Sequence, residues 1–300
     1  MKKILLTGKN GQIGWELQRT LASLGEVVAV GRNELNLADP DSIRKVIREI
    51  RPTLIVNAAA YTAVDKAESE PDLVMAVNGI APGIMAEEAR RLNAALVHYS
   101  TDYVFDGSKR TPYTEADATN PLNVYGRTKL AGEQAVQAAD VPHLILRTSW
   151  VYGARGKNFL LTMLKLAREK NELKVVDDQI GTPTWSRLIA EVTSQILSKM
   201  NSSSHPAAMR EAGGLYHVVA GGRTSWHGFA ERIIGHVTSH SSRAAPKLLA
   251  IPTREYPLPA RRPPYSCLSC EKLTQAFGFA IPAWDKSLAL CLDELAQASS

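Results

Sequence analysis

The stretch TGKNGQIGWEL, residues 7–17, decides the fold of this chain. It follows an apolar run, KILLTG, and opens a segment with helical spacing. Gly8, Gly11 and Gly14 allow close backbone approach at a strand-to-helix turn, and amides at the start of the helix can meet a pyrophosphate. The GxxGxxG spacing departs from GxGxxG because Asn10 replaces the second glycine. A strand before and a helix after the turn nevertheless predict a dinucleotide-binding fold.

Apolar runs of strand length alternate with helical segments through the first half of the chain. We expect strands at 3–8, 27–32, 54–61, 96–101 and 144–150, and helices at 15–25, 39–50, 71–93 and 126–139. Asp39 before Pro40 is typical of a helix start, because the carboxylate caps free amides and proline suits the first helical position. The alternation predicts an α/β protein with a Rossmann-type, doubly wound parallel sheet.

The alternation weakens after residue 150, where prolines and glycines interrupt the chain, as in GTPTWS and PTREYPLPARRPPYS. We therefore expect a dinucleotide-binding domain at 1–150 and a smaller α+β lobe, mainly 151–300, that binds substrate. A helix near 185–200 is expected to pack back on the first domain. The polar stretch 201–214 is predicted to be a surface loop.

Composition excludes several classes of protein. A chain of 300 residues with 45% hydrophobic content can bury a large core. No apolar run approaches the roughly 20 residues of a membrane-spanning helix, and the N-terminus lacks the apolar region of a secretory signal, so we expect a cytoplasmic protein without membrane contact. The net charge of +5 is scattered, which favours a small anionic ligand over nucleic acid. Three cysteines without a second CxxC favour reduced thiols and no zinc site.

The end of the second expected strand bears on the choice of cofactor. An acidic residue usually meets the ribose 2′-hydroxyl of NAD at this position, whereas this chain has Arg32. A guanidinium can pair with a 2′-phosphate, so NADPH is favoured over NADH. Glu34 lies close enough to serve a ribose hydroxyl, which leaves NADH possible.

Tyr125 and Lys129 lie four residues apart in NVYGRTKLAGE, on one face of an expected helix. Ligands of open parallel sheets bind beyond the carboxyl ends of the strands, where Thr101 also lies. We expect the ammonium to lower the phenol's pKa and so prepare Tyr125 to protonate a carbonyl oxygen during hydride transfer. Thr101 would orient that oxygen, and Lys129 would also hold the nicotinamide ribose.

The motifs TGKNGQIG, NAAAYTAVDKAE, YSTDYVFDG, NVYGRTKLAGE and RTSWVYG together resemble the extended short-chain dehydrogenase/reductases. DDQIGTPTW, GLYHVVAGGRTSWHGFA and RRPPYSCL extend the resemblance over nearly the whole chain, towards the members that act on dTDP-4-dehydrorhamnose. The resemblance implies a cytoplasmic enzyme that reduces the 4-keto group of dTDP-4-dehydro-β-L-rhamnose with NADPH or NADH. That reaction is the last step of dTDP-L-rhamnose synthesis and feeds bacterial polysaccharide assembly.

The resemblance also implies roles for particular residues. Tyr125, Lys129 and Thr101 match the catalytic set, and Thr101, Asp102 and Trp150 match residues that touch the nucleotide-sugar. Residues that match the cofactor site, beyond Gly8, Gly14 and Arg32, are Gly11, Gln12, Ile13, Asn36, Leu37, Ala60, Tyr61, Thr62, Tyr99, Tyr125 and Lys129. Arg262 is our own candidate for the substrate diphosphate, because its fork of donors matches phosphate oxygens.

One departure from the family concerns a metal. Some members dimerise around a magnesium ion held by glutamates of both subunits, and Glu16 and Glu294 match two of these positions. Arg187 occupies the third, and a cation there argues against a bound divalent ion. We predict no bridging magnesium and leave a homodimer open.

Two alternatives remain open: a non-catalytic regulatory subunit that keeps the dinucleotide fold, as in methionine adenosyltransferase, and an epimerase or reductase of another nucleotide-sugar. Other conspicuous residues have structural interpretations. His98 is expected to be packed or on the surface, and Trp226 to lie in the core or an interface. Asn78 is expected to satisfy a buried backbone group.

Overall fold

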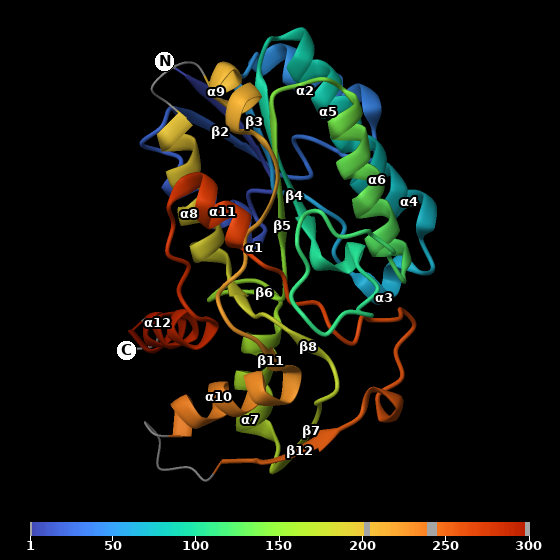
Figure 1. Ribbon diagram of the computed structural model, residues 1–300, viewed down its shortest axis with the longest axis vertical. Helices are drawn as coiled ribbons and strands as arrows, with labels where there is room; N and C mark the ends of the chain where they lie inside the picture. The colour runs from blue at the N-terminus through green and yellow to red at the C-terminus, as the bar shows by residue number, and fades with distance from the viewer. Residues whose placement is uncertain (1, 201–204, 239–244, 298–300) are drawn as a thin grey trace.

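A six-stranded parallel sheet forms the upper part of the molecule (Figure 1). The computed structural model describes residues 2–200, 205–238 and 245–297. The strand order β10-β5-β4-β3-β1-β2 confirms the predicted doubly wound α/β class. The strands are β1 (Lys3–Thr7), β2 (Glu26–Val30), β3 (Leu54–Asn57), β4 (Ala95–Thr101), β5 (His143–Thr148) and β10 (Gly214–His217).

Helices cover both faces of this sheet because alternate strand residues are apolar on both sides. Leu5 and Ile55 pack towards one core cluster, whereas Ile4 and Val56 belong to the other. One face carries α2 (Pro40–Ile50), α5 (Ala81–Arg91) and α6 (Val124–Ala138); the other carries α1 (Gln12–Thr20) and α8 (Ser186–Lys199) (Figure 1). Asp39 caps α2 by accepting a hydrogen bond from the amide of Asp41, as predicted.

The expected helix at 71–93 is divided into three segments. After the short α3 (Val64–Ala67), the chain forms α4 (Pro71–Met75), a π-helical segment η1 (Ala76–Ile80) and α5. Gly132 of α6 packs so closely on η1 that a Cβ atom there would lie 2.2 Å from the Asn78 carbonyl oxygen. The wider π turn therefore coincides with a close backbone approach between this segment and α6.

The second half builds the lower lobe from short pairings (Figure 1). The small sheets pair β6 (Val151–Tyr152) with β9 (Thr184–Trp185), β7 (Glu172–Val176) with β12 (Lys247–Ile251), and β8 (Ile180–Gly181) with β11 (Thr224–Ser225). The helical segments of the second half include α7 (Phe159–Glu169), α10 (Trp226–Thr238), η4 (Thr253–Glu255), α11 (Glu271–Phe277) and α12 (Trp284–Gln297), whereas η2 (Asp102–Val104) follows β4 in the first half. By contrast, α8 packs on α1 and β10 pairs with β5, so both return to the large sheet.

The loop predicted at 201–214 is wrong for most of its length. Residues His205–Ala212 form helix α9, which packs against β4 and β5 near the sheet edge. Residues 201–204 of that prediction lie outside the described residues. Met209 is buried there, so tertiary packing stabilises a helix too short and polar to be recognised alone.

A buried ion pair fastens α6 to the sheet. Glu133 of α6 accepts two hydrogen bonds from the Arg147 guanidinium of β5, at 2.9 and 2.6 Å, and both residues are at most 3% exposed. Because α6 also carries Tyr125 and Lys129, this pair fixes the helix that presents the catalytic candidates.

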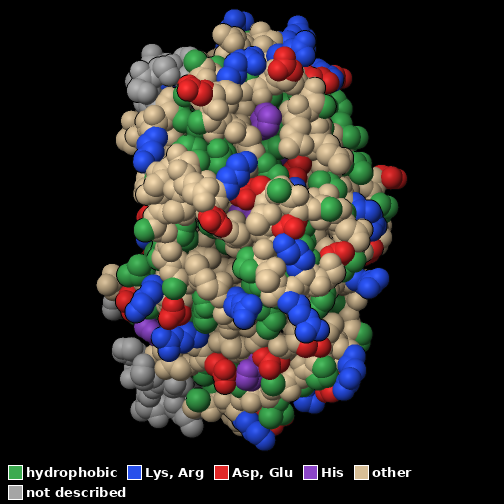
Figure 2. Space-filling view, viewed as in Figure 1, with side chains coloured by type: hydrophobic (Ala, Val, Ile, Leu, Met, Phe, Trp, Pro, Cys, Tyr) green, Lys and Arg blue, Asp and Glu red, His purple; other side chains and the backbone are tan. Residues whose placement is uncertain are grey.

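On the face of the molecule shown in Figure 2, Lys and Arg side chains are interspersed with Asp and Glu.

Candidate active site

The glycine turn after β1 is packed through its backbone. Gly8 has φ +74°, and a Cβ atom there would lie within 2.9 Å of the backbone of Ala58 and Ala59. A Cβ on Gly14 would lie 2.1 Å from the Gly8 carbonyl oxygen, so α1 can start only where both residues are glycine. Gly11, Gln12 and Ile13 then open α1 at the cavity, where first-turn amides have no partner within the helix.

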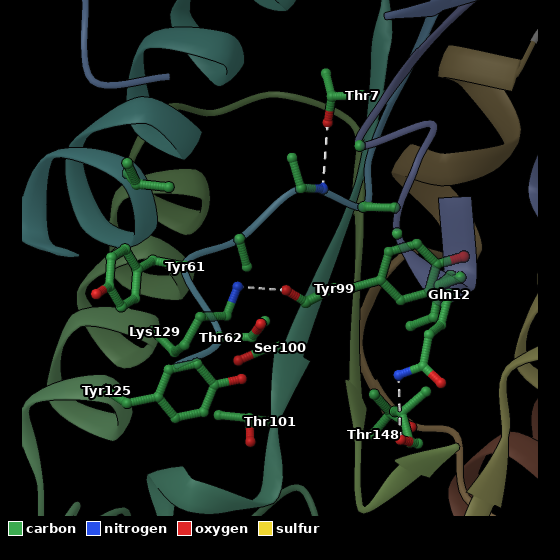
Figure 3. Close-up of a pocket in the computed structure, with 18 of the residues that line it drawn as sticks. Thr7, Gln12, Tyr61, Thr62, Tyr99, Ser100, Thr101, Tyr125, Lys129 and Thr148 are labelled. Carbon is green, nitrogen blue, oxygen red and sulfur yellow. Dashed lines mark hydrogen bonds between the residues drawn. The ribbon is translucent and has the colours of Figure 1, made fainter. Parts of the chain in front are cut away.

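A cavity of about 740 Å³ lies beyond the carboxyl ends of the strands. It collects nearly every residue that the sequence singled out, and Figure 3 shows Thr101, Tyr125 and Lys129 close together in it. Its lining includes Gly8, Gly11, Gln12, Ile13, Arg32, Asn36, Leu37, Ala60, Tyr61, Thr62, Tyr99, Thr101, Asp102, Tyr125, Lys129 and Trp150. Gly14 and Arg262 lie outside the lining. Gly14 affects the cavity indirectly, because it packs against the backbone of Gly8 in the turn.

The contacts of Glu34 favour a 2′-phosphate beside Arg32. Lys9 Nζ lies 2.5 Å from Glu34 Oε1, and the Gly31 amide donates to Oε2 at 2.8 Å. These bonds, led by the one from Lys9, lower the pKa of Glu34 and engage both of its oxygens. Arg32 lines the cavity, so the adenosine end of a dinucleotide would meet the Arg32 cation there and not the Glu34 carboxylate.

Replacing Arg32 with alanine is therefore expected to weaken NADPH more than NADH. A lost charge-assisted bond to phosphate corresponds to a roughly tenfold or larger rise in the NADPH dissociation constant, while NADH changes little. Titration of both cofactors by fluorescence measures the difference. Glu34→Gln is the matched control, expected to leave the ratio nearly unchanged; equal weakening of both cofactors by Arg32→Ala would remove the basis for preferring NADPH.

Tyr125 reaches the cavity from the first turn of α6. Asn123 caps this helix by accepting from the Gly126 amide at 2.8 Å, and a Cβ on Gly126 would lie 2.2 Å from the Tyr103 carbonyl oxygen. Burial raises the pKa of Tyr125 to about 12, although a hydrogen bond with Thr101 opposes the rise. The phenol is therefore protonated at neutral pH.

The expected lowering of the phenol's pKa by Lys129 is not what the structure shows. Lys129 Nζ donates to the Tyr99 carbonyl oxygen at 2.6 Å and lies 3.3 Å from His98 Nε2 (Figure 3 shows the first of these bonds). Burial raises the pKa of Tyr125, the bond with Thr101 opposes the rise, and the nearby Asp102 charge adds to it. Burial also lowers the pKa of Lys129 to about 8, against the opposing field of Glu133.

Thr101 already has partners in the site. Its Oγ1 donates to Asp102 Oδ1 at 3.0 Å and accepts from the Tyr103 amide at 3.2 Å. Burial raises the pKa of Asp102 to about 6, with bonds from Ser266 and Thr101 opposing the rise. Within the described residues, Asp102 Oδ2 has no hydrogen-bond partner although it is buried at the cavity. That oxygen is a ready acceptor for a sugar hydroxyl.

Asn78 has the structural role predicted for it. Its side chain accepts from the Tyr61 amide at 2.8 Å and donates to the Tyr61 carbonyl oxygen at 3.0 Å. Both bonds hold the loop after β3 against η1. The Tyr61 hydroxyl donates to Glu70 at 2.6 Å, which fixes the ring at the cavity wall.

Two tryptophans form the opposite wall. Trp150 adopts φ +44° and stacks on Trp226, with ring centroids 3.5 Å apart and planes 4° apart. A Cβ on Gly181 would lie 2.3 Å from the Trp150 ring, so the glycine makes room for it. Trp226, expected in the core or an interface, lines the cavity instead.

Sequence reasoning also missed two buried hydroxyl groups. Ser100 and Thr148 line the cavity, and among the described residues Ser100 Oγ and Thr148 Oγ1 lack a hydrogen-bond partner. Buried polar atoms of this kind usually find a partner, and a bound carboxamide or hydroxyl supplies one. With the glycine turn and Arg32, they make the cavity fit a nicotinamide dinucleotide. The position of Ser100 one residue before Thr101, at a strand end, was the available signal.

Arg262 is engaged elsewhere. Its guanidinium donates twice to Asp65, at 3.0 and 2.7 Å, and once to the Ala260 carbonyl oxygen. The Arg262 bond lowers the pKa of Asp65. The ion pair ties the segment before Tyr265 to α3, so the arginine serves here as a link between loops.

Arg187 bridges the two glutamates that match the family's metal positions. Its Nε lies 3.2 Å from Glu16 Oε2 and its Nη2 lies 2.9 Å from Glu294 Oε1. The Arg187 guanidinium therefore places a positive charge between the two carboxylates within a single chain. The absence of a bridging magnesium stays a prediction.

In the described part of the chain, no helix is long and apolar enough to cross a membrane.

A glycine turn at the head of a parallel sheet, with the Tyr125–Lys129 pair at its carboxyl edge, defines an extended short-chain dehydrogenase/reductase, a class of NAD(P)H-dependent oxidoreductases. The family model described as "RmlD substrate binding domain" matches residues 1–297. The chain therefore belongs to the dTDP-4-dehydrorhamnose reductase family.

Individual relatives agree with this assignment. The chain is 48% identical to a dTDP-4-dehydrorhamnose reductase of Burkholderia thailandensis, over 98% of this chain and 99% of the relative. A crystal structure of such a reductase from Clostridium acetobutylicum superimposes with a TM-score of 0.89 at 38% identity, covering 98% and 99% of the two chains. The Bacillus anthracis reductase, solved in complex with NADP, superimposes with a TM-score of 0.87 at 35% identity, covering 98% and 100%.

Proposed function

We propose that the chain reduces the 4-keto group of dTDP-4-dehydro-β-L-rhamnose, giving dTDP-β-L-rhamnose in the last step of dTDP-L-rhamnose synthesis. NADPH is the preferred reductant, and the reaction takes place in the cytoplasm. The observation that carries the proposal is the meeting of Tyr125, Lys129 and Thr101 with the glycine turn in one cavity. The names of the relatives supply the substrate.

The bound nicotinamide supplies hydride to the carbonyl carbon. Tyr125, neutral because its pKa is about 12, donates its phenolic proton to the carbonyl oxygen. The Thr101 hydroxyl, whose hydrogen rotates about the C–O bond, orients that oxygen. Asp102 and Trp150 hold the sugar: the carboxylate accepts a hydrogen bond from a sugar hydroxyl, and the indole packs on the sugar ring.

Lys129 has two tasks in this scheme. Its ammonium stabilises the negative charge that develops on the Tyr125 oxygen as the proton leaves, and it binds the ribose next to the nicotinamide. Both tasks need the charged form. The bond to the Tyr99 carbonyl oxygen keeps the ammonium at the floor of the cavity.

The pKa of Lys129 leads to a pH prediction. Because burial lowers this pKa to about 8, the ammonium is present below that pH and is lost as the pH rises through it. Above this pKa the pH–rate profile is expected to have an alkaline limb, on which the catalytic rate at saturating substrate falls about tenfold per pH unit. A pH–rate profile measures this directly, with thermal stability recorded at each pH as the control. A flat profile up to the pKa of ordinary lysine would contradict the charged role.

Turnover with chemically matched substrates tests the function itself. NADPH consumption is followed with enzymatically generated dTDP-4-dehydrorhamnose and, in parallel, with the equivalent UDP-sugar. Turnover that requires the thymidine nucleotide supports the proposal. Tight cofactor binding without any turnover would favour a regulatory subunit, and cofactor retained in oxidised form through purification would favour an epimerase.

A further inference from the structure

A buried row of polar side chains runs behind the cavity across three strands. Thr7 Oγ1 of β1 donates to Asn57 Oδ1 of β3 at 2.7 Å, and Asn57 Nδ2 lies 3.1 Å from His98 Nδ1 of β4. His98 Nε2 lies 3.3 Å from Lys129 Nζ. All four residues are at most 2% exposed. Thr7 and Lys129 also line the cavity, whereas Asn57 and His98 do not, so the two inner residues depend on their neighbours in the row for hydrogen bonds and the protons along the row are coupled.

His98 has one donor and one acceptor to offer. Burial and the neighbouring Lys129 hold its pKa well below the usual value, so the imidazole is neutral. A neutral ring carries a proton on a single nitrogen. An ammonium has only donors, so His98 Nε2 can meet the charged form of Lys129 only if the ring proton sits on Nδ1.

Asn57 determines where that proton sits. With its Nδ2 facing Nδ1, as found here, the ring proton belongs on Nε2 and the row suits an uncharged lysine amine. A half-turn of the amide places Oδ1 against Nδ1, which moves the ring proton to Nδ1 and leaves Nε2 free to accept from the ammonium. Thr7 accommodates both orientations, because a hydroxyl both donates and accepts.

We propose that His98, oriented by Asn57, is a positioning residue that sets the charge of Lys129. The inference rests on the proposed role of Lys129 in the reduction. The titratable groups around the ammonium are His98 on β4 and Tyr125 and Glu133 on α6, and Arg147 of β5 neutralises Glu133. Glu133 favours the charged lysine from one side, and His98 provides or withholds an acceptor on the other.

The test compares the pH–rate profiles of the wild type, His98→Leu and His98→Gln. Leucine removes the acceptor that Nε2 provides once the Asn57 amide has turned, so the alkaline limb is expected to move to lower pH by about one to two units. Glutamine carries an amide oxygen near the position of Nε2, so it is expected to keep the limb near its wild-type position. NADPH titration shows that each variant retains its fold and cofactor site. A limb that stays in place in His98→Leu, or moves equally in both variants, overturns the inference.

Asn57→Asp provides an independent arm. A carboxylate only accepts, so it holds the ring proton on Nδ1, keeps Nε2 as acceptor and is expected to move the limb to higher pH. An unmoved limb counts against the inference. Tyr125→Phe distinguishes failure of the proposed function from failure of this inference. Full turnover in that variant refutes the proposed function. An inactive Tyr125→Phe, combined with unmoved limbs in all His98 and Asn57 variants, refutes only the role of His98.

Discussion

Tyr125→Phe is expected to lower the catalytic rate by about 10² or more, because the variant has no proton to donate to the carbonyl oxygen. The phenylalanine ring keeps the edge contact with Tyr103, whose centroid lies 5.7 Å away, so the cavity retains its shape. Affinity for NADPH is expected to change little. Single-turnover and steady-state measurements with dTDP-4-dehydrorhamnose separate the lost rate from any change in binding.

Tyr152→Phe is the matched control for this experiment. Tyr152 is fully buried, and within the described residues its hydroxyl has no hydrogen-bond partner, but it does not line the cavity. Removing that hydroxyl should leave the rate near the wild-type value. If Tyr125→Phe turned over as fast as Tyr152→Phe, the phenol of Tyr125 would not be the proton donor.

Arg147→Met is expected to lower the free energy of unfolding by about 3–5 kcal/mol, because it leaves the Glu133 carboxylate buried without its partner. Methionine replaces most of the side-chain volume, so the loss reflects the stranded charge more than a cavity. Urea unfolding followed by circular dichroism measures the change. The double variant Glu133→Leu/Arg147→Met removes both charges and should recover much of the loss.

Arg48→Met controls for the geometry of the pair. Arg48 makes the same two-pronged contact with Glu88, at 2.9 and 2.6 Å, but its side chain is 48% exposed and Arg91 lies 3.6 Å from the same carboxylate. Water and the second arginine screen this pair, so the loss there is expected to be much smaller than in Arg147→Met. Similar losses in Arg48→Met and Arg147→Met would show that burial does not set the strength of these pairs.

Much of the sheet and of the site could be predicted because both depend on local patterns. Five of the six main strands are apolar runs bounded by turn signals, and parallel strands place their carboxyl ends at one edge. Residues at or just beyond the ends of different strands, such as Thr101 of β4 and Trp150 after β5, therefore meet in one cavity although they are distant in sequence.

Other features depend on contacts that no local pattern carries. Strand β10 has four residues and exists because the edge of β5 is open to it. Trp226 reaches the cavity because it stacks on Trp150, and His98 acquires its role from Lys129, which lies on a different element. The pKa of Tyr125 was predicted with the wrong sign because the sequence shows the neighbouring charge but not the depth of burial.

The late return of β10 to the sheet has a consequence for synthesis of the chain. Strand β5 ends at Thr148, but the strand that covers its edge is completed only at His217, about 70 residues later. At roughly 5–20 residues per second, a ribosome needs about 4–14 s to supply it. During that interval the nascent sheet presents an unpaired strand, so its solubility depends on the speed of translation between these two points.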